Sequence, residues 1–591
     1  IDLGKVFKAY KELSKRHEVL IIEGAGGLLA PIKENYLVAD LIRDLDAPIV
    51  IVARAGLGTI NHTLLTQRYA LDYGIKVKGV IINGYQGKGA AEKTNPGVIK
   101  EFSDFPLLGI IPHIKNVKSK KGLVILAKEA SRDINMKALL KEDKSLTRRL
   151  AEVDRQYLWH PFTQMKDWIK DQPLIIEEAK GSYLKDTNGK WYLDGVASLW
   201  VNVHGHQKKE IDAAVKRQLN RAAHSTLLGL GNIPSIELAK SLIKIAPQGL
   251  TKVFYSDSGS TAVEIALKMA YQYWQYLDQA KTKFIHLENA YHGDTIGSVS
   301  VGGMDLFHKV YQGLLFESYK VDSPYCYRCP KGKAYPLCGW ECLDSLKDIL
   351  REHGASIAAL IVEPLVQAAA GILVWPQGIY KELARLCKEH NVLLIADEVA
   401  VGVGRTGTMF ASEWELVCPD ILCLAKGITG GYLPLAATLT TQKIFDAFLG
   451  EYKEQNTFFH GHTYTGNPLA CAAALANLGL FKQEKTLERL KPKIKFLKNE
   501  LERFKELKHV GDIRQKGFMV GIELVKDKQT KEPYPWEERI GIQVCQKVRE
   551  YGVILRPLGN VIVLIPPLSI TKEELKQLID AAYKAIEVVA G

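Results

Sequence analysis

Short, continuously apolar runs alternate with helical segments along this chain, and this alternation limits the folds open to it. In the first part of the chain the expected strands are residues 19–22, 48–52, 77–82 and 107–111, with a helix over about 61–73. Strands that are apolar throughout are buried on both faces, and alternation with helices places them in a parallel sheet covered by helices. The sequence therefore predicts an α/β protein.

The same alternation repeats on a larger scale after residue 150. There the expected buried strands are residues 252–255, 284–286, 359–362, 392–395 and 421–424. A chain of 591 residues is too long for one ordinary core. Residues 129–150 are charged and weakly periodic, so we expect a first domain at 1–128, a linker at 129–150 and a second domain at 151–591.

Charge and composition exclude several classes of partner. The formal charge of +12 arises from lysines scattered over many segments, without the basic stripe interleaved with aromatics that nucleic-acid binding needs. No apolar run is long enough for a membrane span. The nine cysteines show no pattern of a secreted disulfide framework, and no targeting segment is visible. We expect a cytoplasmic protein without nucleic-acid or membrane partners.

A serine-rich turn, Ser256-Asp-Ser-Gly-Ser-Thr261, follows one buried strand and opens a helical run. Free amides at a helix start, together with hydroxyls, form a cup for phosphate. An ordinary helix N-cap would use the same residues, so the turn alone leaves both interpretations open.

Two ionisable residues end later buried strands. Asp397 ends the strand over 392–395, where a carboxylate can pair with a pyridinium nitrogen. Lys426 follows the strand over 421–424, and poor solvation there lowers the pKa of an amine and favours Schiff-base chemistry. A strand-end aspartate alone is often only a helix cap.

The order of these features resembles that of the fold-type I aminotransferases, which use pyridoxal phosphate. After the phosphate cup come Tyr291-His-Gly293, Asp397, Lys426 and Gly461-His-Thr463, and the run DEVAVGVGRTG at 397–407 resembles the class III subgroup. The resemblance implies a large α/β domain and a small α+β domain. It also implies three catalytic residues: Lys426 as the Schiff-base lysine, Asp397 at the pyridine nitrogen and Tyr291 stacked on the ring. Further cofactor-binding residues would be Ser258, Gly259 and Ser260 and, from a partner subunit, His462 and Thr463, which makes a homodimer the minimum unit.

Within that class the second domain resembles diaminopelargonate aminotransferase of biotin synthesis. The resemblance rests on WHPF at 159–162, SLWVNVHG at 198–205, GNPLACA at 466–472 and LRP at 555–557, among other motifs. It implies transfer of an amino group from a small-molecule donor to a keto acid, 8-amino-7-oxononanoate. Substrate-binding residues would be Trp200 in the tunnel wall, Tyr291, Lys426, Gly461, and Arg556 on the substrate carboxylate. Glu363 would orient neighbours near the cofactor, or be structural.

The first domain resembles dethiobiotin synthetase through EGAGG at 23–27, GLGTINH at 56–62, Asn83 and PLLGIIP at 106–112. The resemblance implies an N-terminal P-loop-type parallel sheet, with Glu23 as a magnesium ligand, Asn83 as an adenine contact and the helix start at 58–61 as a carboxylate site. No phosphate loop of the G-x-x-x-x-G-K-[ST] kind occurs in the chain, so we expect no ligase activity from these residues alone. Magnesium and ATP would bind only with the missing part. The chain opens at Ile1 inside an amphipathic stretch, and we expect a truncated fusion.

Three substitutions bear on the amino donor. In the branch that uses S-adenosylmethionine, tyrosine, tryptophan and tyrosine stand where this chain has Phe162, Leu199 and Val563. The residues at these three positions resemble those of the branch that uses lysine as the amino donor.

Four cysteines lie close together in the sequence at Cys326, Cys329, Cys338 and Cys342. Such a set can form a zinc or iron–sulfur site. The spacing is irregular for zinc modules, which favours a reduced loop packed by small apolar thiols.

Two alternative functions fit the same motifs. The second domain could be an ω-amino-acid aminotransferase or an aminomutase of the same class. The first domain could be a docking or dimerisation module without catalysis.

Overall fold

The computed structural model describes residues 1–591 except 15, 25, 46, 116, 118 and 141–143. The chain forms two compact units, Ile1–Phe162 and Thr163–Gly591. The first unit therefore extends beyond the expected linker at 129–150, because much of that stretch is helical and Ala151 is buried. Within the described part of the chain no helix is both long and apolar enough to cross a membrane.

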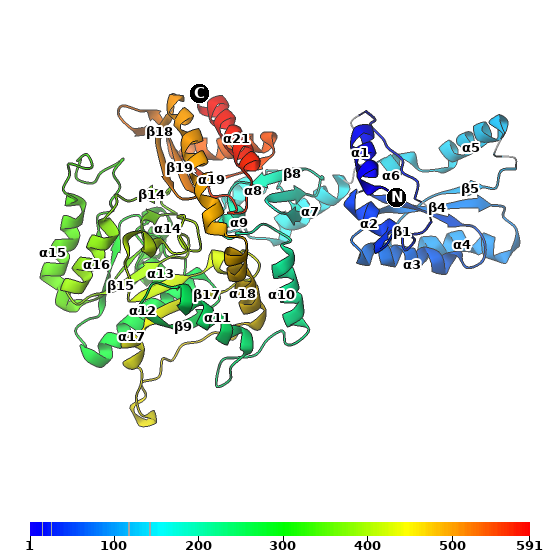
Figure 1. Ribbon diagram of the computed structural model, residues 1–591. Helices are drawn as coiled ribbons and strands as arrows, with labels where there is room; N and C mark the ends of the chain where they lie inside the picture. The colour runs from blue at the N-terminus through cyan, green and yellow to red at the C-terminus, as the bar shows by residue number, and fades with distance from the viewer. Residues whose placement is uncertain (15, 25, 46, 116, 118, 141–143) are drawn as a thin grey trace. The chain divides into compact units, whose positions relative to one another are not determined.

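The first unit is built on a parallel sheet of three strands in the order β3-β4-β5. Helices α3 and α4 connect consecutive strands and cover one face of the sheet (Figure 1), over a core that includes Ile51, Val80, Ile82 and Ile99. The elements are α1 (Leu3–Ser14), β1 (Pro31–Lys33), β2 (Tyr36–Leu37), α2 (Val38–Asp44), β3 (Ile49–Arg54), α3 (Thr59–Asp72), β4 (Val77–Tyr85), α4 (Gly89–Phe102), β5 (Leu107–Pro112), α5 (Lys120–Asp133), α6 (Met136–Leu140) and α7 (Lys144–Tyr157).

The prediction of a strand at residues 19–22 is wrong. Residues 19–22 form no strand, and Ile21 is 90% exposed. The other expected strands of the unit pair as β3, β4 and β5. An apolar run of four residues is compatible with a strand, but a strand forms only where a neighbour satisfies its backbone hydrogen bonds. Among the described residues, none pairs with 19–22 as a strand.

The second unit contains a seven-stranded sheet in the order β11-β10-β12-β15-β16-β17-β9, and every expected strand of this region lies in it. β10, β11, β12, β15 and β16 run parallel, whereas β17 is antiparallel to β16 and β9. The strands are β9 (Leu250–Ser256), β10 (Lys283–Leu287), β11 (Tyr319–Val321), β12 (Ile357–Val362), β15 (Leu393–Asp397), β16 (Ile421–Leu424) and β17 (Ala436–Thr441). β12 and β16 are buried at every position, as continuous apolar strands require.

Besides the antiparallel pair formed by Val366–Gln367 and Leu373–Val374, two larger sheets belong to the described part of the second unit. One has the order β18-β19-β23-β22 and packs with α19, α20 and α21, while the other has the order β21-β8-β7-β6 (Figure 1). This is the expected large α/β region with a smaller α+β part. The strands are β6 (Ile176–Lys180), β7 (Tyr183–Asp186), β8 (Trp191–Asp194), β13 (Val366–Gln367), β14 (Leu373–Val374), β18 (Val510–Lys516), β19 (Met519–Asp527), β20 (Glu532–Pro533), β21 (Val553–Ile554), β22 (Arg556–Leu558) and β23 (Val561–Leu564). The helices are α8 (Met165–Trp168), α9 (Ala197–Trp200), α10 (Lys209–Leu219), α11 (Ile233–Ile245), α12 (Gly259–Leu277), α13 (Ile296–Ser300), α14 (Asp305–His308), α15 (Asp344–His353), α16 (Ile379–Glu389), α17 (Gln442–Asp446), α18 (Pro468–Gln483), α19 (Thr486–Leu501), α20 (Ile540–Lys547) and α21 (Lys572–Ala590).

Candidate active site

Lys426 lies directly after the buried strand β16, where the backbone turns into a short 3-10 helix, Lys426–Thr429. Its φ of 44° is unusual for a residue with a side chain. The Nζ atom lies 4.7 Å from the centre of the Trp200 ring. Burial lowers the pKa of the Lys426 amine, and the carboxylates of Asp397 and Glu363 oppose this shift. The amine is thus more readily deprotonated than an exposed lysine, as a nucleophile requires.

Trp200 sits on a left-handed turn. Residues Ala197, Ser198, Leu199 and Trp200 have φ values of 48°, 48°, 72° and 69°. Left-handed backbone costs about 1–2 kcal/mol per residue that carries a side chain, so the surrounding contacts must hold the turn in place. This turn could not be predicted from the sequence, because none of the four residues is glycine.

Buried polar contacts hold this turn from both ends. At its start the Ser198 hydroxyl donates to Asp194 Oδ2 (2.7 Å). Beyond its end the Arg405 guanidinium, 1% exposed, donates to the carbonyls of Asn202 (2.7 Å) and Pro566 (2.6 Å). These contacts fix Trp200 beside the lysine, and motif reading missed the roles of both Asp194 and Arg405.

Asp397 ends β15 and lies buried against His292. One oxygen, Oδ2, lies 2.7 Å from His292 Nδ1, and the other accepts the Val399 N–H (3.0 Å). The side chains of the pair are 0% and 5% exposed, so bulk water scarcely competes for the contact. His292 was not expected to have a role, although it lies next to Tyr291 in the sequence. It orients the carboxylate that sequence reasoning assigned to the cofactor nitrogen.

Tyr291 is linked to a second carboxylate, Glu363. The Tyr291 N–H donates to Glu363 Oε1 (3.2 Å), and its hydroxyl donates to Asp294 (2.8 Å). The Ala368 N–H donates to the other Glu363 oxygen (2.9 Å). Burial raises the pKa of Glu363 to about 7, and the Asp397 carboxylate adds to the shift while His292 opposes it. Glu363 therefore positions the loop that carries Tyr291.

The expected phosphate cup is a capped helix start. Ser258 caps α12 by accepting the Thr261 N–H (3.3 Å), which leaves the amides of Gly259 and Ser260 at the first turn without intrahelical acceptors. Two glycines allow the close packing behind this turn. A Cβ on Gly259 would lie 2.6 Å from Val399 Cγ1, and one on Gly293 would lie 2.0 Å from Ser260 Oγ.

His462 lies beside the same turn of its own chain. Its Nδ1 is 2.8 Å from Asp257 Oδ2, while Gly461 and Thr463 are exposed. The resemblance implied that His462 and Thr463 reach the phosphate of a partner subunit. The contact with Asp257 shows that His462 also reaches the phosphate turn within one chain, so its supply to a partner stays a prediction.

The residues expected to bind substrate lie on different elements. Arg556 starts β22 and is the cross-strand partner of Val563 on β23, which is 1% exposed. Leu199 precedes Trp200 and is 45% exposed. Phe162 belongs to the first unit, with a φ of 49° and 55% exposure. Val563 is thus next to Arg556, whereas Phe162 is not placed relative to them.

The expected nucleotide residues of the first unit are mostly at its surface. Glu23 and Asn83 are exposed, and Ala25 of the glycine-rich run lies outside the described residues. Gly58 caps α3 with a φ of 86°, and the buried Asn95 amide donates to the carbonyls of Ala55 and Gly56 before it. The helix start is therefore held in place, whereas the role of Glu23 as a metal ligand stays a prediction.

Comparison with known proteins settles the family. The family described as aminotransferase class-III matches residues 165–586, and the family described as AAA domain matches residues 1–121. This chain belongs to the class III aminotransferases. It is thus a pyridoxal-phosphate-dependent transferase, with an N-terminal domain consistent with the expected likeness to dethiobiotin synthetase.

Several relatives of this class III aminotransferase share one name. The chain is similar to two proteins named adenosylmethionine-8-amino-7-oxononanoate aminotransferase. The protein from Geobacter sulfurreducens is 56% identical, with 75% of this chain and 99% of the relative covered. The protein from Nitratidesulfovibrio vulgaris is 58% identical, with 75% of this chain and 83% of the relative covered. Among solved structures, the enzyme of that name from Methanocaldococcus jannaschii has a TM-score of 0.72 at 50% identity, covering 76% of this chain and 100% of that chain. A PLP-bound amine transaminase from an uncultivated Pseudomonas species has a TM-score of 0.70 at 38% identity, covering 73% and 99%.

The residues of this aminotransferase fit pyridoxal phosphate. A helix start with free amides, an oriented carboxylate and a partly desolvated lysine stand at the carboxyl ends of β9, β15 and β16, the edge where such sheets bind ligands. His292 Nε2 and Ser256 Oγ are buried polar atoms without a partner among the described residues. These residues are of the kinds that could hold the cofactor's phosphate, ring nitrogen and aldehyde.

Proposed function

We propose that this protein transfers an amino group to the ketone of 8-amino-7-oxononanoate and forms 7,8-diaminononanoate, a step of biotin synthesis. The observation that carries the proposal is the identity of 51–58% to three relatives with this printed name, over 83–99% of their length. An intact Lys426 and Asp397 centre supports it, because the chemistry requires both. The amino donor is lysine or S-adenosylmethionine.

Pyridoxal phosphate, when bound, supplies an electron sink for the carbon that loses or gains a proton. The chain's own residues have separate tasks. The Lys426 amine, with its lowered pKa, acts as nucleophile and carries the proton. Asp397, oriented by His292, would pair with the pyridine nitrogen and favour its protonated form. The amides of Gly259 and Ser260 and the hydroxyl of Ser258 bind phosphate.

Further residues bind substrate and shield the reacting atoms. The buried Trp200 ring covers one side of the Lys426 amine and excludes water from it. Tyr291, with its backbone held by Glu363, would stack on the cofactor ring. Arg556 binds the substrate carboxylate through its guanidinium fork.

The active unit is a homodimer in the cytoplasm, with His462 and Thr463 of each chain beside the phosphate of the other. The shared ligands implied by the aminotransferase resemblance support the dimer. The nine cysteines are free thiols, which suits a reducing compartment. The first domain is a dethiobiotin synthetase remnant, with magnesium at Glu23 and ATP bound only in the presence of its phosphate loop.

A second candidate is an ω-amino-acid aminotransferase. Several solved relatives are ω-transaminases, at 32–34% identity and TM-scores of 0.71–0.72. Their identity is well below that of the relatives named for the 8-amino-7-oxononanoate reaction, so we rank this candidate second.

The test is direct conversion by the purified chain. It is incubated with 8-amino-7-oxononanoate and with lysine or S-adenosylmethionine, and 7,8-diaminononanoate is measured by mass spectrometry. Lys426→Ala is the matched inactive control. Turnover of ornithine or 4-aminobutyrate without any diaminononanoate would replace the proposal with the second candidate.

A further inference from the structure

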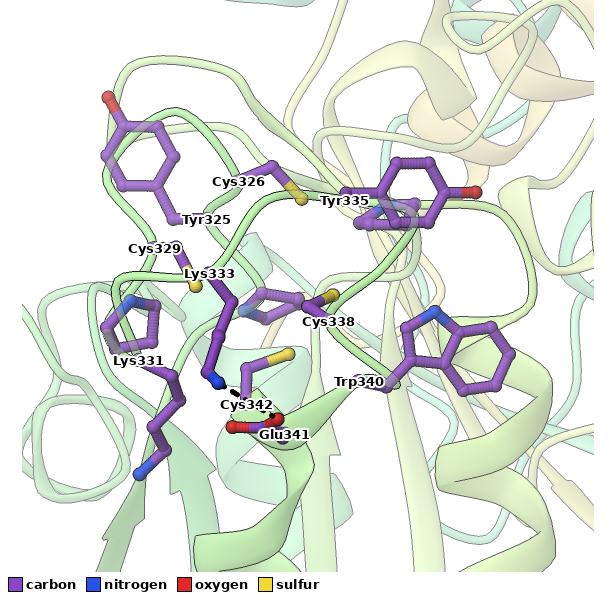
Figure 2. A pocket seen from close by; sticks show the side chains of 13 residues that line it. Tyr325, Cys326, Cys329, Lys331, Lys333, Tyr335, Cys338, Trp340, Glu341 and Cys342 are labelled. Carbon is purple, nitrogen blue, oxygen red and sulfur yellow. Dashed lines mark ion pairs between the residues drawn. The ribbon is translucent and has the colours of Figure 1, made fainter.

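Four cysteines of the loop that runs from β11 to the 3-10 helix Glu341–Leu343 line one pocket as free thiols (Figure 2). The two lysines of this pocket are paired, Lys331 with Asp322 (2.9 Å) and Lys333 with Glu341 (3.7 Å). Within the described residues, no group of three or more histidine, cysteine, aspartate or glutamate side chains could hold a metal ion. The reduced thiol loop expected from the sequence stays a prediction.

The segment that follows Tyr291 is fastened to the start of α12 at Ser260. The Asp294 N–H donates to Ser260 Oγ (3.2 Å), and the Ser298 hydroxyl donates to the Ser260 carbonyl (3.1 Å). Ser260 belongs to the turn that is proposed to bind the cofactor phosphate. The same residue therefore connects the phosphate turn with the segment 291–298, which leads from Tyr291 into α13.

Helix α13 packs against α12 (Figure 1) but has no side-chain cap of its own. Its N-cap residue is Thr295, whose hydroxyl donates to Ser298 Oγ (3.1 Å) and makes no cap hydrogen bond. The amides of Gly297 and Ser298, in the first turn, lack an acceptor within their own helix. They need an acceptor from another element, because an N–H left unpaired away from water costs as much as a lost hydrogen bond.

Glu264, on the second turn of α12, supplies this acceptor. Its Oε1 atom accepts the Gly297 N–H (2.7 Å) and the Ser298 N–H (3.3 Å). The helix dipole also favours a carboxylate at the start of a helix. The contact is close, since a Cβ on Gly297 would lie 2.2 Å from Glu264 Oε2. Glu264 thus caps a helix that starts about 30 residues further along the chain.

An ion pair within α12 does not account for Glu264. Lys268 stands one turn further along this helix, the spacing at which glutamate and lysine often pair. Its Nζ atom instead donates to the Phe459 carbonyl (3.4 Å) and lies 3.1 Å from His460 Nδ1. The hydrogen bonds of the half-buried Glu264 go to the start of α13.

We propose that Glu264 is a positioning residue, which holds the segment 291–298 against the phosphate turn so that the Tyr291 ring can stack on pyridoxal phosphate. Two contacts carry this positioning to Tyr291: its hydroxyl donates to Asp294 (2.8 Å), and the Asp294 N–H donates to Ser260. Without the Glu264 carboxylate, the start of α13 loses its acceptor and moves away from α12. The inference rests on the stacking role of Tyr291 in the proposed function, but not on which donor or ketone reacts.

Variants of the full chain test this role. Glu264→Ala removes the acceptor, whereas Glu264→Gln keeps a side-chain oxygen for the same two N–H groups. Glu382→Ala on α16 is the matched control, because this half-buried helix glutamate accepts two hydrogen bonds from Arg385 (2.8 and 2.7 Å). Apoprotein is titrated with pyridoxal phosphate, and visible circular dichroism is recorded per bound cofactor at saturation. This dichroism reports how the cofactor ring is held, and a loss of global stability alone leaves it unchanged.

We expect Glu264→Ala to weaken the affinity for pyridoxal phosphate about tenfold, the scale of a hydrogen bond to a charged group, and to reduce the dichroism. Glu264→Gln should restore the affinity to within about threefold of the unchanged protein, together with the dichroism, since neutral hydrogen bonds remain. Glu382→Ala should change neither. Because Glu264 acts through Tyr291, Glu264→Ala should have little further effect in a Tyr291→Ala background.

Gly297→Ala tests the same contact from the other side should Glu264→Ala not fold, because the added Cβ displaces the carboxylate. Unchanged affinity and dichroism in Glu264→Ala, or in Gly297→Ala, overturns the inference. Equal losses in Glu264→Ala and Glu264→Gln, or a full loss in the Tyr291→Ala background, also overturn it. Failure of the proposed function reads differently: Tyr291→Ala alone then keeps the affinity and dichroism of the unchanged protein, which removes the stacking role itself.

Discussion

Gly293→Ala tests whether the turn at Ser260 holds the cofactor phosphate. Gly293 has a φ of 119°, and an added Cβ would lie 2.0 Å from Ser260 Oγ and 2.9 Å from Ser260 Cα. The positive φ alone costs on the order of 1–3 kcal/mol for alanine. The contact with Ser260 Cα involves backbone, so rotation of a side chain cannot relieve it, and the turn at the start of α12 must shift.

The affinity for pyridoxal phosphate measures this shift. If about 2 kcal/mol of the cost falls on the cofactor-bound form, affinity falls roughly thirtyfold, since 1.4 kcal/mol is tenfold. Apoprotein is titrated with the cofactor and binding is followed by its visible absorbance. Gly479→Ala in α18 is the matched control, because its Cβ would meet nothing within 4 Å.

A second variant guards against misfolding. Ser260→Ala keeps the backbone and removes only a hydroxyl, whose loss costs about 0.5–1.5 kcal/mol and weakens affinity by roughly two- to tenfold. If Gly293→Ala folds and binds the cofactor as tightly as the unchanged protein, Ser260 does not hold the phosphate and the reasoning fails.

Three further predictions concern the lysine-centred site. Arg556→Ala weakens ketone binding by about 2–4 kcal/mol and leaves the donor half-reaction almost intact. Single-turnover kinetics measure each half-reaction separately, and equal damage to both refutes the assignment of Arg556 to the ketone substrate. Lysine converts the cofactor to its amine form faster than S-adenosylmethionine does. The reason is that Phe162, Leu199 and Val563 offer fewer hydrogen bonds to a nucleoside than the tyrosine, tryptophan and tyrosine of the other branch. Stopped-flow absorbance with each amine alone decides between the two donors. The pKa of Glu363 is raised in the folded apoprotein from 4.5 to about 7, so the folded state binds the extra proton and loses stability as pH rises through this window. Relative to Glu363→Gln, the free energy of unfolding of apoprotein should fall by about 3 kcal/mol between pH 4.5 and 7.5, and parallel pH profiles would contradict this.

The sequence by itself determined the features that depend on local pattern. Each continuous apolar run that was expected to form a strand after residue 150 lies in the large sheet. Such runs are recognisable because burial on both faces removes polar residues from these strands. Their carboxyl ends then marked Asp397 and Lys426, since parallel strands bring those ends to one edge. The order of motifs was enough to identify the aminotransferase family.

Only the tertiary structure decided features that depend on distant partners. The run at 19–22 has the composition of a strand but pairs with no strand in the part of the chain that the structure describes. The left-handed turn under Trp200 persists because Arg405, far along the chain, binds the carbonyls of Asn202 and Pro566. His292 orients Asp397 across more than a hundred residues of sequence. For the turn and for Asp397, the deciding energy comes from a contact between segments that local propensity does not bring together, and only the folded chain supplies it.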